Sequence, residues 1–219
     1  MSVVVVYVHG LWLSGWEGSW LQRRLARYLG CDTRFFEYPS VTRDLNANAA
    51  ALSRYLSQIR ADTVHLVGHS MGGFLIVEFF ARHVSADGLI EGRHALPPGR
   101  IVLLGTPMRG SRSAGRLARL PCGRRIMGLT ATEVLLRPDP PRWSGARELG
   151  VIAGNLAFGL GALMGPLPAA SDGTVMVEET QLEGAADHLT LRVSHSGLLF
   201  SGAVARQTAA FLRSGRFER

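Results

Sequence analysis

Short apolar runs alternate with longer stretches of helical periodicity along most of the chain. Runs rich in β-branched residues predict buried strands at 3–8, 63–67, 100–104 and 150–153, with a weaker strand at 188–193. Apolar positions at helical spacing predict helices at about 16–29, 44–59, 71–84 and 197–213. Strands and helices that alternate in this order form a parallel sheet with helices on both faces, so we expect an α/β fold.

One segment, residues 109–147, breaks this alternation. It consists of short helical pieces separated by Pro121, Gly123, Gly128 and a proline-rich cluster at 138–141. We interpret it as a cap or lid inserted over the sheet. A chain of 219 residues can bury one core. We therefore expect a single domain over residues 1–219 that carries this insertion.

The distribution of charge adds a second feature to the same segment. All 24 basic residues are arginine, and the chain has a formal net charge of +7. Residues 109–147 contain nine arginines against Glu133 and Asp139, which alone gives a net charge of +7. Such a segment favours contact with anionic lipid or a membrane surface, and a solvated helical face is the alternative. We expect no nucleic-acid partner, because no recognised nucleic-acid motif accompanies the arginines.

Nothing in the sequence indicates a membrane span or a secretory leader. Every apolar stretch is interrupted before the roughly 18 residues that a span requires. The apolar run at 2–8 has no basic region before it and leads into His9 and Gly10, which favours a strand. Cys31 and Cys122 are expected to be free thiols. We therefore expect a cytoplasmic protein, and a periplasmic or secreted location would need a leader that this sequence lacks.

The most informative motif is Gly-His-Ser-Met-Gly at residues 68–72. It lies between a predicted strand and a predicted helix, which is the context of a nucleophile elbow. In an elbow the serine occupies a sharp turn, and its neighbours must be small enough for the chain to pass close to other backbone. Gly68 and Gly72 meet this requirement, so we predict that Ser70 is a nucleophile.

A serine nucleophile needs a base to take its proton and an acid to orient that base. His195 lies between the last predicted strand and the last helix, at the same end of the sheet as Ser70, and is the predicted base. Asp172 lies in a turn between serine and histidine in chain order and is the predicted acid. Asp187 is separated from His195 by the length of the last strand, and Asp139 has no strand before it.

Two backbone N–H groups are expected to stabilise an oxyanion. Met71 directly follows the nucleophile, and Leu11 lies in the loop after the first strand. We take His9, Trp12 and Met108 as candidate residues of a substrate pocket, with packing as the alternative for His9 and Trp12. His65 and His69 have the i, i+4 spacing of a helical metal site, but one lies in a predicted strand and the other in a turn. The His-Glu-x-x-His pattern is absent, so no metal is expected.

Together these residues resemble the α/β-hydrolase superfamily, in particular its small lipase-like and esterase-like serine hydrolases. The resemblance rests on motifs at 9–10, Tyr38, 68–73, 104–107, 171–175 and 194–197. It implies an α/β-hydrolase fold with a mostly parallel sheet, a Ser70–His195–Asp172 triad, a cap over the pocket and no cofactor. Met108 departs from the family pattern, in which a polar residue often follows Gly-Thr-Pro.

The expected activity is hydrolysis of a small-molecule carboxylic ester, of esterase or lipase type, through an acyl-enzyme intermediate. A thioesterase or acyltransferase would use the same residues and remains an alternative. The alternative outside enzymes is a non-catalytic hydrolase fold that binds a lipid or another partner. Such a protein would not need all three residues of the triad.

Overall fold

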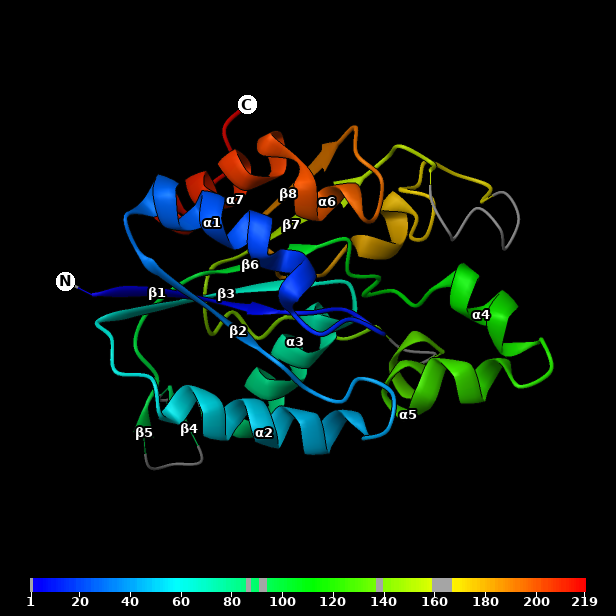
Figure 1. The fold of residues 1–219 in the computed structure, drawn as a ribbon, viewed down its shortest axis with the longest axis horizontal. Coiled ribbons are helices and arrows are strands. Elements are labelled where there is room, and N and C mark those ends of the chain that lie inside the picture. The colour runs from blue at the N-terminus through cyan, green and yellow to red at the C-terminus, as the bar shows by residue number, and fades with distance from the viewer. Residues whose placement is uncertain (1, 86–87, 91–93, 137–139, 159–166) are drawn as a thin grey trace.

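The computed structural model describes residues 2–85, 88–90, 94–136, 140–158 and 167–219. Six parallel strands form its main sheet (Figure 1). In sheet order the strands are β2 (Asp32–Phe36), β1 (Val3–Val8), β3 (Thr63–His69), β6 (Ile101–Leu104), β7 (Leu149–Gly154) and β8 (Asp187–Leu191). A separate antiparallel pair consists of β4 (Leu89–Ile90) and β5 (His94–Ala95). The expected α/β fold with a mostly parallel sheet is confirmed.

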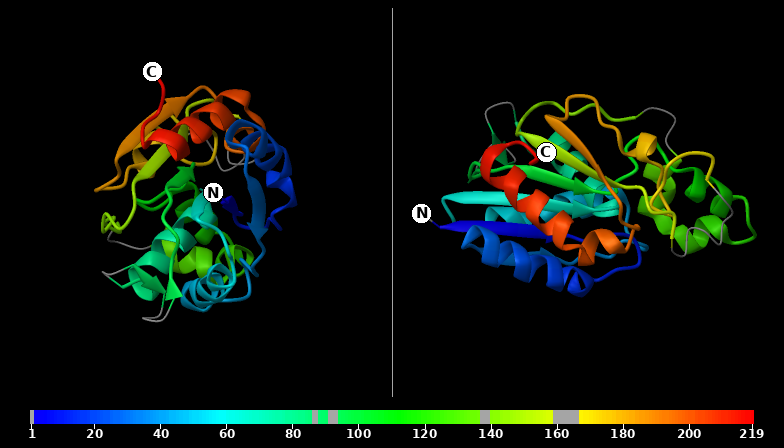
Figure 2. Two further views of the ribbon diagram at one scale, coloured as in Figure 1. Left: turned by 90° about the vertical axis from the view of Figure 1, so that its left-hand side faces the viewer. Right: turned by 90° about the horizontal axis from the view of Figure 1, so that it is seen from above.

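Helices cover both faces of this sheet (Figure 2). One face carries α1 (Ser19–Leu29), α6 (Gly197–Phe200) and α7 (Gly202–Ser214), and the other carries α2 (Leu45–Ser57) and α3 (Met71–His83). The described residues also include two short 3₁₀ helices, η1 (Trp16–Gly18) and η3 (Val177–Thr180). Successive side chains of a strand point to opposite faces of the sheet, so β1 contributes to two cores. Val4 and Val6 pack with α2 and α3, whereas Val5 and Tyr7 pack with α1 and α7.

Strand β2 and the last predicted helix differ from the sequence predictions. Strand β2 was not predicted, because its sequence Asp-Thr-Arg-Phe-Phe mixes polar and apolar residues, and the structure leaves Asp32 and Arg34 exposed at the side of the sheet. The helix predicted over 197–213 is interrupted at Ser201. The Ser201 hydroxyl accepts the N–H of Val204 at 3.4 Å and so caps the start of α7.

The chain between β6 and β7 includes two further helices, α4 (Arg112–Ala118) and α5 (Gly123–Leu135). Both lie beyond the carboxyl end of the sheet, where its strands finish (Figure 1). The last part of the predicted insertion, near residue 147, lies at the other end of the sheet. Arg147 donates to the carbonyl of Val64 at 2.7 Å, near the start of β3, so it belongs to the amino end of the sheet. Among the described residues, the part over the carboxyl end therefore finishes with α5.

No helix within the described ranges is both long enough and apolar enough to cross a membrane.

Candidate active site

Ser70 occupies a strained turn between β3 and α3. Its backbone dihedrals are φ 51° and ψ −119°, a combination that a residue with a side chain rarely adopts. Two hydrogen bonds hold the turn, one from the N–H of Ser70 to the carbonyl of Leu104 at 2.8 Å and one from the N–H of Gly73 to the carbonyl of Ser70 at 3.0 Å. This geometry is that of the elbow that the motif predicts.

Three glycines around Ser70 allow backbone segments to approach closely. A Cβ atom on Gly72 would lie 2.1 Å from the carbonyl oxygen of Val8, and one on Gly68 would lie 2.7 Å from Cα of Gly73. The expected roles of Gly68 and Gly72 are therefore confirmed. Gly73 has the same constraint, which the sequence analysis did not identify, since its Cβ would lie 2.0 Å from Oγ1 of Thr106.

Asp172 and His195 form a direct pair at the carboxyl end of the sheet. Nδ1 of His195 lies 2.7 Å from Oδ2 of Asp172, whose side chain is almost fully buried. The other carboxylate oxygen accepts the N–H groups of Thr174 at 2.9 Å and Val175 at 2.7 Å. A carboxylate oxygen accepts hydrogen bonds, so this contact selects the His195 tautomer with a proton on Nδ1, in which Nε2 carries the lone pair.

The main chain strengthens this pairing. The N–H of His195 donates to the carbonyl of Asp172 at 2.9 Å. Gly105, with φ +57°, passes beside both side chains, and a Cβ on it would lie 3.2 Å from Oδ2 of Asp172 and 3.2 Å from Cε1 of His195. Asp187 lies elsewhere, since its carboxylate accepts from the Arg219 guanidinium at 2.6 Å. Asp139, the other aspartate weighed as the acid, lies outside the described residues.

His69 connects Ser70 to this pair. Its ring centroid lies 4.9 Å from that of His195, and its Nε2 lies 3.3 Å from the His195 carbonyl oxygen. Burial, followed by the charge of His195, lowers the pKa of His69 to about 3, so the ring is neutral at ordinary pH. The contact brings Ser70, the next residue, to the same end of the sheet as His195. Within the described residues, no hydrogen bond joins the Ser70 hydroxyl to the His195 ring.

The loop after β1 lies against Ser70. A Cβ on Gly10 would lie 3.2 Å from Cβ of Ser70, so Leu11 follows directly after a close contact with the elbow. Met71 is the first residue of α3, and the N–H groups of a first helical turn have no partner within the helix. Both predicted oxyanion donors therefore belong to segments adjacent to Ser70. Their role in stabilising an oxyanion stays a prediction.

His9 packs within the protein and does not face a pocket. Its side chain is fully buried, and its Nδ1 donates to the carbonyl of Gly10 at 2.8 Å. Its Nε2 accepts the N–H of Tyr38 at 3.2 Å, and the two rings stack with centroids 4.3 Å apart. Burial lowers the pKa of His9. The expectation that His9 lines the pocket is therefore corrected, because both ring nitrogens have partners in the core.

The other two candidate pocket residues have different surroundings, and only the expectation for Met108 is corrected. Met108 is buried in the core on the α2 and α3 side of the sheet, so it is not an exposed lining residue. Trp12 is 56% exposed, and its indole Nε1 donates to the carbonyl of Ile126 in α5 at 3.0 Å. Trp12 therefore connects the loop after β1 to α5 at the surface.

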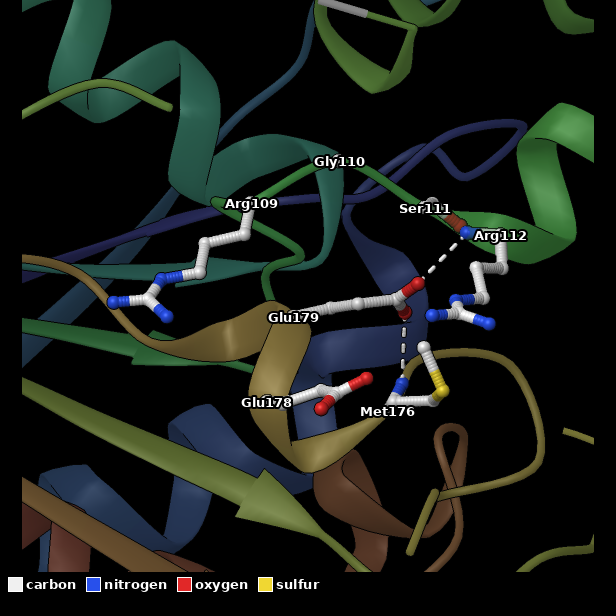
Figure 3. Close-up of a pocket in the computed structure, with 7 residues that line it drawn as sticks. All are labelled: Arg109, Gly110, Ser111, Arg112, Met176, Glu178 and Glu179. Atoms are coloured by element: carbon white, nitrogen blue, oxygen red, sulfur yellow. Dashed lines mark hydrogen bonds between the residues drawn. The ribbon is translucent and has the colours of Figure 1, made fainter. Parts of the chain in front are cut away.

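A cavity of about 340 Å³ lies between the start of the insertion and η3 (Figure 3). Its lining residues are Arg109, Gly110, Ser111, Arg112, Met176, Glu178 and Glu179. Glu179 closes one side, because its carboxylate accepts the N–H groups of Arg112 at 2.7 Å and Met176 at 2.9 Å. Burial raises the pKa of Glu179. These contacts hold the first turn of α4 against the segment that carries Asp172, and the cavity includes no member of the predicted triad.

Within the described ranges, no group of three or more histidine, cysteine, aspartate or glutamate side chains is placed to hold a metal ion.

Solved structures with the same fold include several hydrolases. The mature lipase BlEst2 of Bacillus licheniformis shares 20% identity at a TM-score of 0.72, and the match covers 97% of this chain and 91% of the lipase. The type II thioesterase BorB of the borrelidin biosynthetic cluster shares 20% identity at a TM-score of 0.59, with coverage of 100% and 94%. The metagenomic carboxyl esterase MGS0156 shares 18% identity at a TM-score of 0.59, with coverage of 89% and 64%.

Two further comparisons use the sequence of the chain alone. A comparison with curated proteins gives no match. The sequence model of the alpha/beta hydrolase family matches residues 5–213, which includes most of β1, the other five strands of the main sheet and the segments that carry Ser70, Asp172 and His195. The chain belongs to the alpha/beta hydrolase family.

Proposed function

We propose that the protein is a serine hydrolase that cleaves carboxylic esters through an acyl-enzyme intermediate. The observation that carries this proposal is the 2.7 Å contact between Asp172 and His195 at the end of the sheet where Ser70 occupies its strained turn. A purely structural histidine would not need an oriented carboxylate on one nitrogen and a free lone pair on the other. The neighbouring esterase and lipase structures agree with this proposal at the level of the fold.

In the acylation step, Oγ of Ser70 attacks the ester carbonyl carbon while Nε2 of His195 takes the hydroxyl proton. Asp172 holds the imidazole in place and stabilises the imidazolium that forms. The carbonyl oxygen becomes an oxyanion that accepts the N–H groups of Leu11 and Met71. When this intermediate collapses, the bond to the leaving alkoxide breaks, and His195 returns the proton to release an alcohol.

Deacylation repeats the sequence with water as the nucleophile. His195 takes a proton from the water, the hydroxyl attacks the acyl carbon, and the proton goes to Oγ of Ser70 as the acid leaves. An acyl thioester would pass through the same acyl-enzyme with a thiol as the leaving group. Oxygen esters and thioesters would react with the same three residues, so the test includes both kinds of acyl donor.

The test is the pre-steady-state hydrolysis of p-nitrophenyl esters of increasing acyl length, with acyl thioesters measured in parallel. We expect a burst of p-nitrophenol equal to the enzyme concentration and complete dependence on Ser70. Ser70→Ala should lose the burst, and its kcat should fall by about 10⁴-fold or more. Ser144→Ala changes an exposed serine and serves as the matched control, with wild-type kinetics expected.

Each outcome has a defined meaning. Faster turnover of thioesters than of oxygen esters of equal acyl length would keep Ser70 as the nucleophile and assign a thioesterase. Turnover that survives in Ser70→Ala would contradict the mechanism. No turnover of any acyl donor by the folded wild type would favour the binding-protein alternative.

A further inference from the structure

Large apolar side chains at the surface gather at one end of the molecule. Eight are largely exposed among the described residues: Trp12, Trp16, Leu120, Ile126, Leu129, Leu156, Phe158 and Phe200. All eight lie in segments that follow the carboxyl ends of β1, β6, β7 and β8. Scattered single apolar residues are normal on a soluble protein, but their restriction to one end marks an interaction surface.

One part of this surface is the outward side of α5 and the turn before it. We call it the α5 surface and define it by Leu120, Arg124, Arg125, Ile126 and Leu129, which are all exposed. Leu120 is 53% exposed, Ile126 is 51% exposed and Leu129 is 59% exposed. Leucine and isoleucine at these positions cannot be explained by the core, because the opposite side of the helix already fills it.

The inward side of α5 is fixed to the sheet domain. Met127, Ala131 and Val134 are buried in the core that α2 and α3 share. The N–H of Leu129 donates to the carbonyl of Val41 at 3.0 Å, and the Thr130 hydroxyl donates to the carbonyl of Arg43. These contacts set the rotation of α5 and therefore keep the apolar side chains of the α5 surface pointing outward.

A non-helical residue within α5 contributes to this orientation. Gly128 has φ 81° and ψ −178°, and a Cβ on it would lie 2.3 Å from the carbonyl oxygen of Val41. Only glycine fits both the dihedrals and the close contact. The resulting kink presents Leu129 on the outside while Met127 and Thr130 remain buried.

Arginines near these apolar side chains in the sequence lack side-chain partners among the described residues. Within the described part of the chain, the guanidinium groups of Arg119, Arg124 and Arg125 make no ion pair or hydrogen bond. Residues 109–136 contain six arginines against a single acidic residue, Glu133. The α5 surface therefore combines unpaired positive charge with exposed apolar groups.

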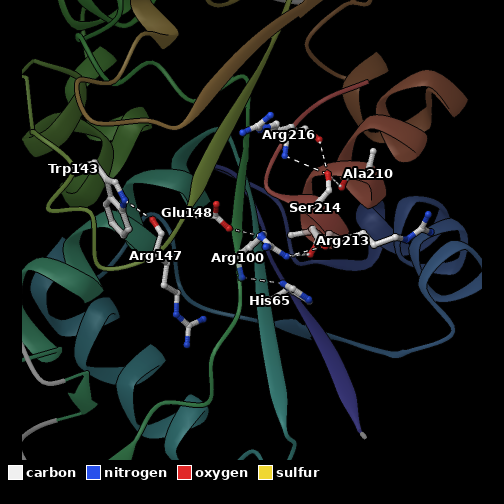
Figure 4. Close-up of polar contacts among 10 residues, drawn as sticks. His65, Arg100, Trp143, Arg147, Glu148, Ala210, Arg213, Ser214 and Arg216 are labelled. Carbon is white, nitrogen blue, oxygen red and sulfur yellow. Dashed lines mark hydrogen bonds and ion pairs between the residues drawn. The ribbon is translucent and has the colours of Figure 1, made fainter. Parts of the chain in front are cut away.

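Arg100, at the amino end of the sheet, has the opposite surroundings (Figure 4). Arg100 pairs with Glu148 at 2.6 Å and donates to the carbonyls of Leu212 at 3.1 Å and Arg213 at 2.9 Å. The guanidinium group of Arg100 is therefore engaged within the protein, whereas those of Arg124 and Arg125 are not engaged by any described residue.

We propose that the α5 surface docks on an anionic lipid bilayer. Arginines bind anionic headgroups, and isolated leucine, isoleucine and tryptophan side chains from separate segments enter the layer beneath them. A fluid surface accommodates such scattered groups, whereas a folded acidic protein would need a complementary shape. The inference goes beyond the proposed ester hydrolysis and does not require it, because docking depends on neither Ser70 nor His195.

The test is flotation of the Ser70→Ala protein with vesicles of phosphatidylcholine alone or mixed with phosphatidylglycerol, so that no lipid is hydrolysed. We expect binding to the mixed vesicles that weakens with added salt. Arg124→Gln with Arg125→Gln should weaken binding roughly thirtyfold, because each arginine near an anionic leaflet contributes about a fivefold factor. Ile126→Ser with Leu129→Ser should weaken it about tenfold.

The matched control replaces two arginines on other helices, Arg54→Gln with Arg206→Gln, which are exposed and should leave binding unchanged. Circular dichroism and the melting temperature of each variant verify that it is folded, independently of any hydrolytic activity. Equal binding by wild type and both α5 variants would overturn the proposal. Equally tight binding to soluble polyglutamate, with no effect of Ile126→Ser and Leu129→Ser, would also overturn it and assign an acidic protein partner.

Discussion

The two ends of the sheet use arginine in opposite ways. At the amino end, Arg147 donates to the carbonyls of Val64 and Pro97 and lies over the ring of Phe80 at 5.3 Å. At the carboxyl end, Arg124 has no side-chain partner among the described residues. The first arrangement satisfies backbone carbonyls and joins neighbouring segments, while the second leaves charge available to a ligand or a surface. The difference separates the part of the protein that maintains the fold from the part that carries the candidate site.

Backbone strain follows the same division. Three described residues other than glycine have positive φ, namely Ser70 at 51°, Trp12 at 60° and Cys122 at 62°. All three lie at the carboxyl end of the sheet or in the segment over it. Strain of this kind persists only where surrounding contacts enforce it, and it gathers at functional sites. The comparison therefore predicts that substituting polar side chains at the carboxyl end mainly changes activity and that substituting those at the amino end mainly changes stability.

The largest effect is expected from Asp172→Asn. The new amide would donate to Nδ1 of His195 and stabilise the wrong tautomer, so kcat/KM for a p-nitrophenyl ester should fall by about 10⁴-fold with little change in the melting temperature. Asp187→Asn is the matched control, because Asp187 is the first residue of β8 and lies at the amino end of the sheet. It should keep nearly full activity. Equal losses in the two variants would contradict the assignment of Asp172 as the acid.

Gly72→Ala tests whether the elbow depends on close backbone approach. Because the added methyl would lie 2.1 Å from the carbonyl oxygen of Val8, we expect the free energy of unfolding to fall by about 3 kcal/mol. Urea denaturation measures this change. Gly115→Ala is the control, since nothing lies within 4 Å of its added methyl in α4, and alanine there should stabilise the protein by about 0.5–1 kcal/mol. An unchanged free energy of unfolding in Gly72→Ala would show that the backbone at the elbow is less tightly packed than described.

Arg147→Met addresses the amino end directly. The substitution leaves the carbonyls of Val64 and Pro97 without their donor, so unfolding should become easier by about 2 kcal/mol. The activity on a soluble ester should stay within about twofold of wild type, since Arg147 is remote from Ser70. Arg54→Met, which changes an exposed arginine of α2, should alter neither quantity. A selective loss of activity in Arg147→Met would break the proposed division between the two ends.

His65 makes stability at the amino end dependent on pH. Burial, followed by the charges of Arg100 and Arg147, lowers its pKa to about 4, while the unfolded chain should titrate near the ordinary 6.5. Between these values the unfolded state binds the proton and the folded state does not. The free energy of unfolding should therefore decrease as pH falls, by up to about 1.4 kcal/mol per pH unit from this residue.

The measurement compares urea denaturation at several pH values for wild type and His65→Asn. Asparagine retains an acceptor for the N–H of Arg100, which lies 2.9 Å from Nδ1 of His65, but it does not titrate. The variant should show a shallower decline below pH 6.5, while His94→Asn, which changes an exposed histidine, should follow wild type. Identical slopes for wild type and His65→Asn would rule out this contribution.

Local signals allowed much of the fold and the site geometry to be predicted. The residues at 68–72 specify their own turn, and Asp172 and His195 follow strands whose ends must meet in a parallel sheet. Features that depend on distant contacts were missed. His9 is buried by stacking on Tyr38, 29 positions away, and Arg147 was grouped with the positive segment although the chain carries it to the amino end of the sheet. Neither contact leaves a pattern in the sequence around it.

The most direct test of the central claim is to locate the adduct formed by a fluorophosphonate with the wild-type protein. The account predicts a single modification on the peptide that contains Ser70, at a rate that drops sharply in Asp172→Asn and His195→Ala. Intact-protein mass spectrometry followed by peptide mapping measures both the stoichiometry and the position. An unmodified Ser70 in folded protein, or a principal adduct on another residue, would contradict the assignment of Ser70 as the nucleophile.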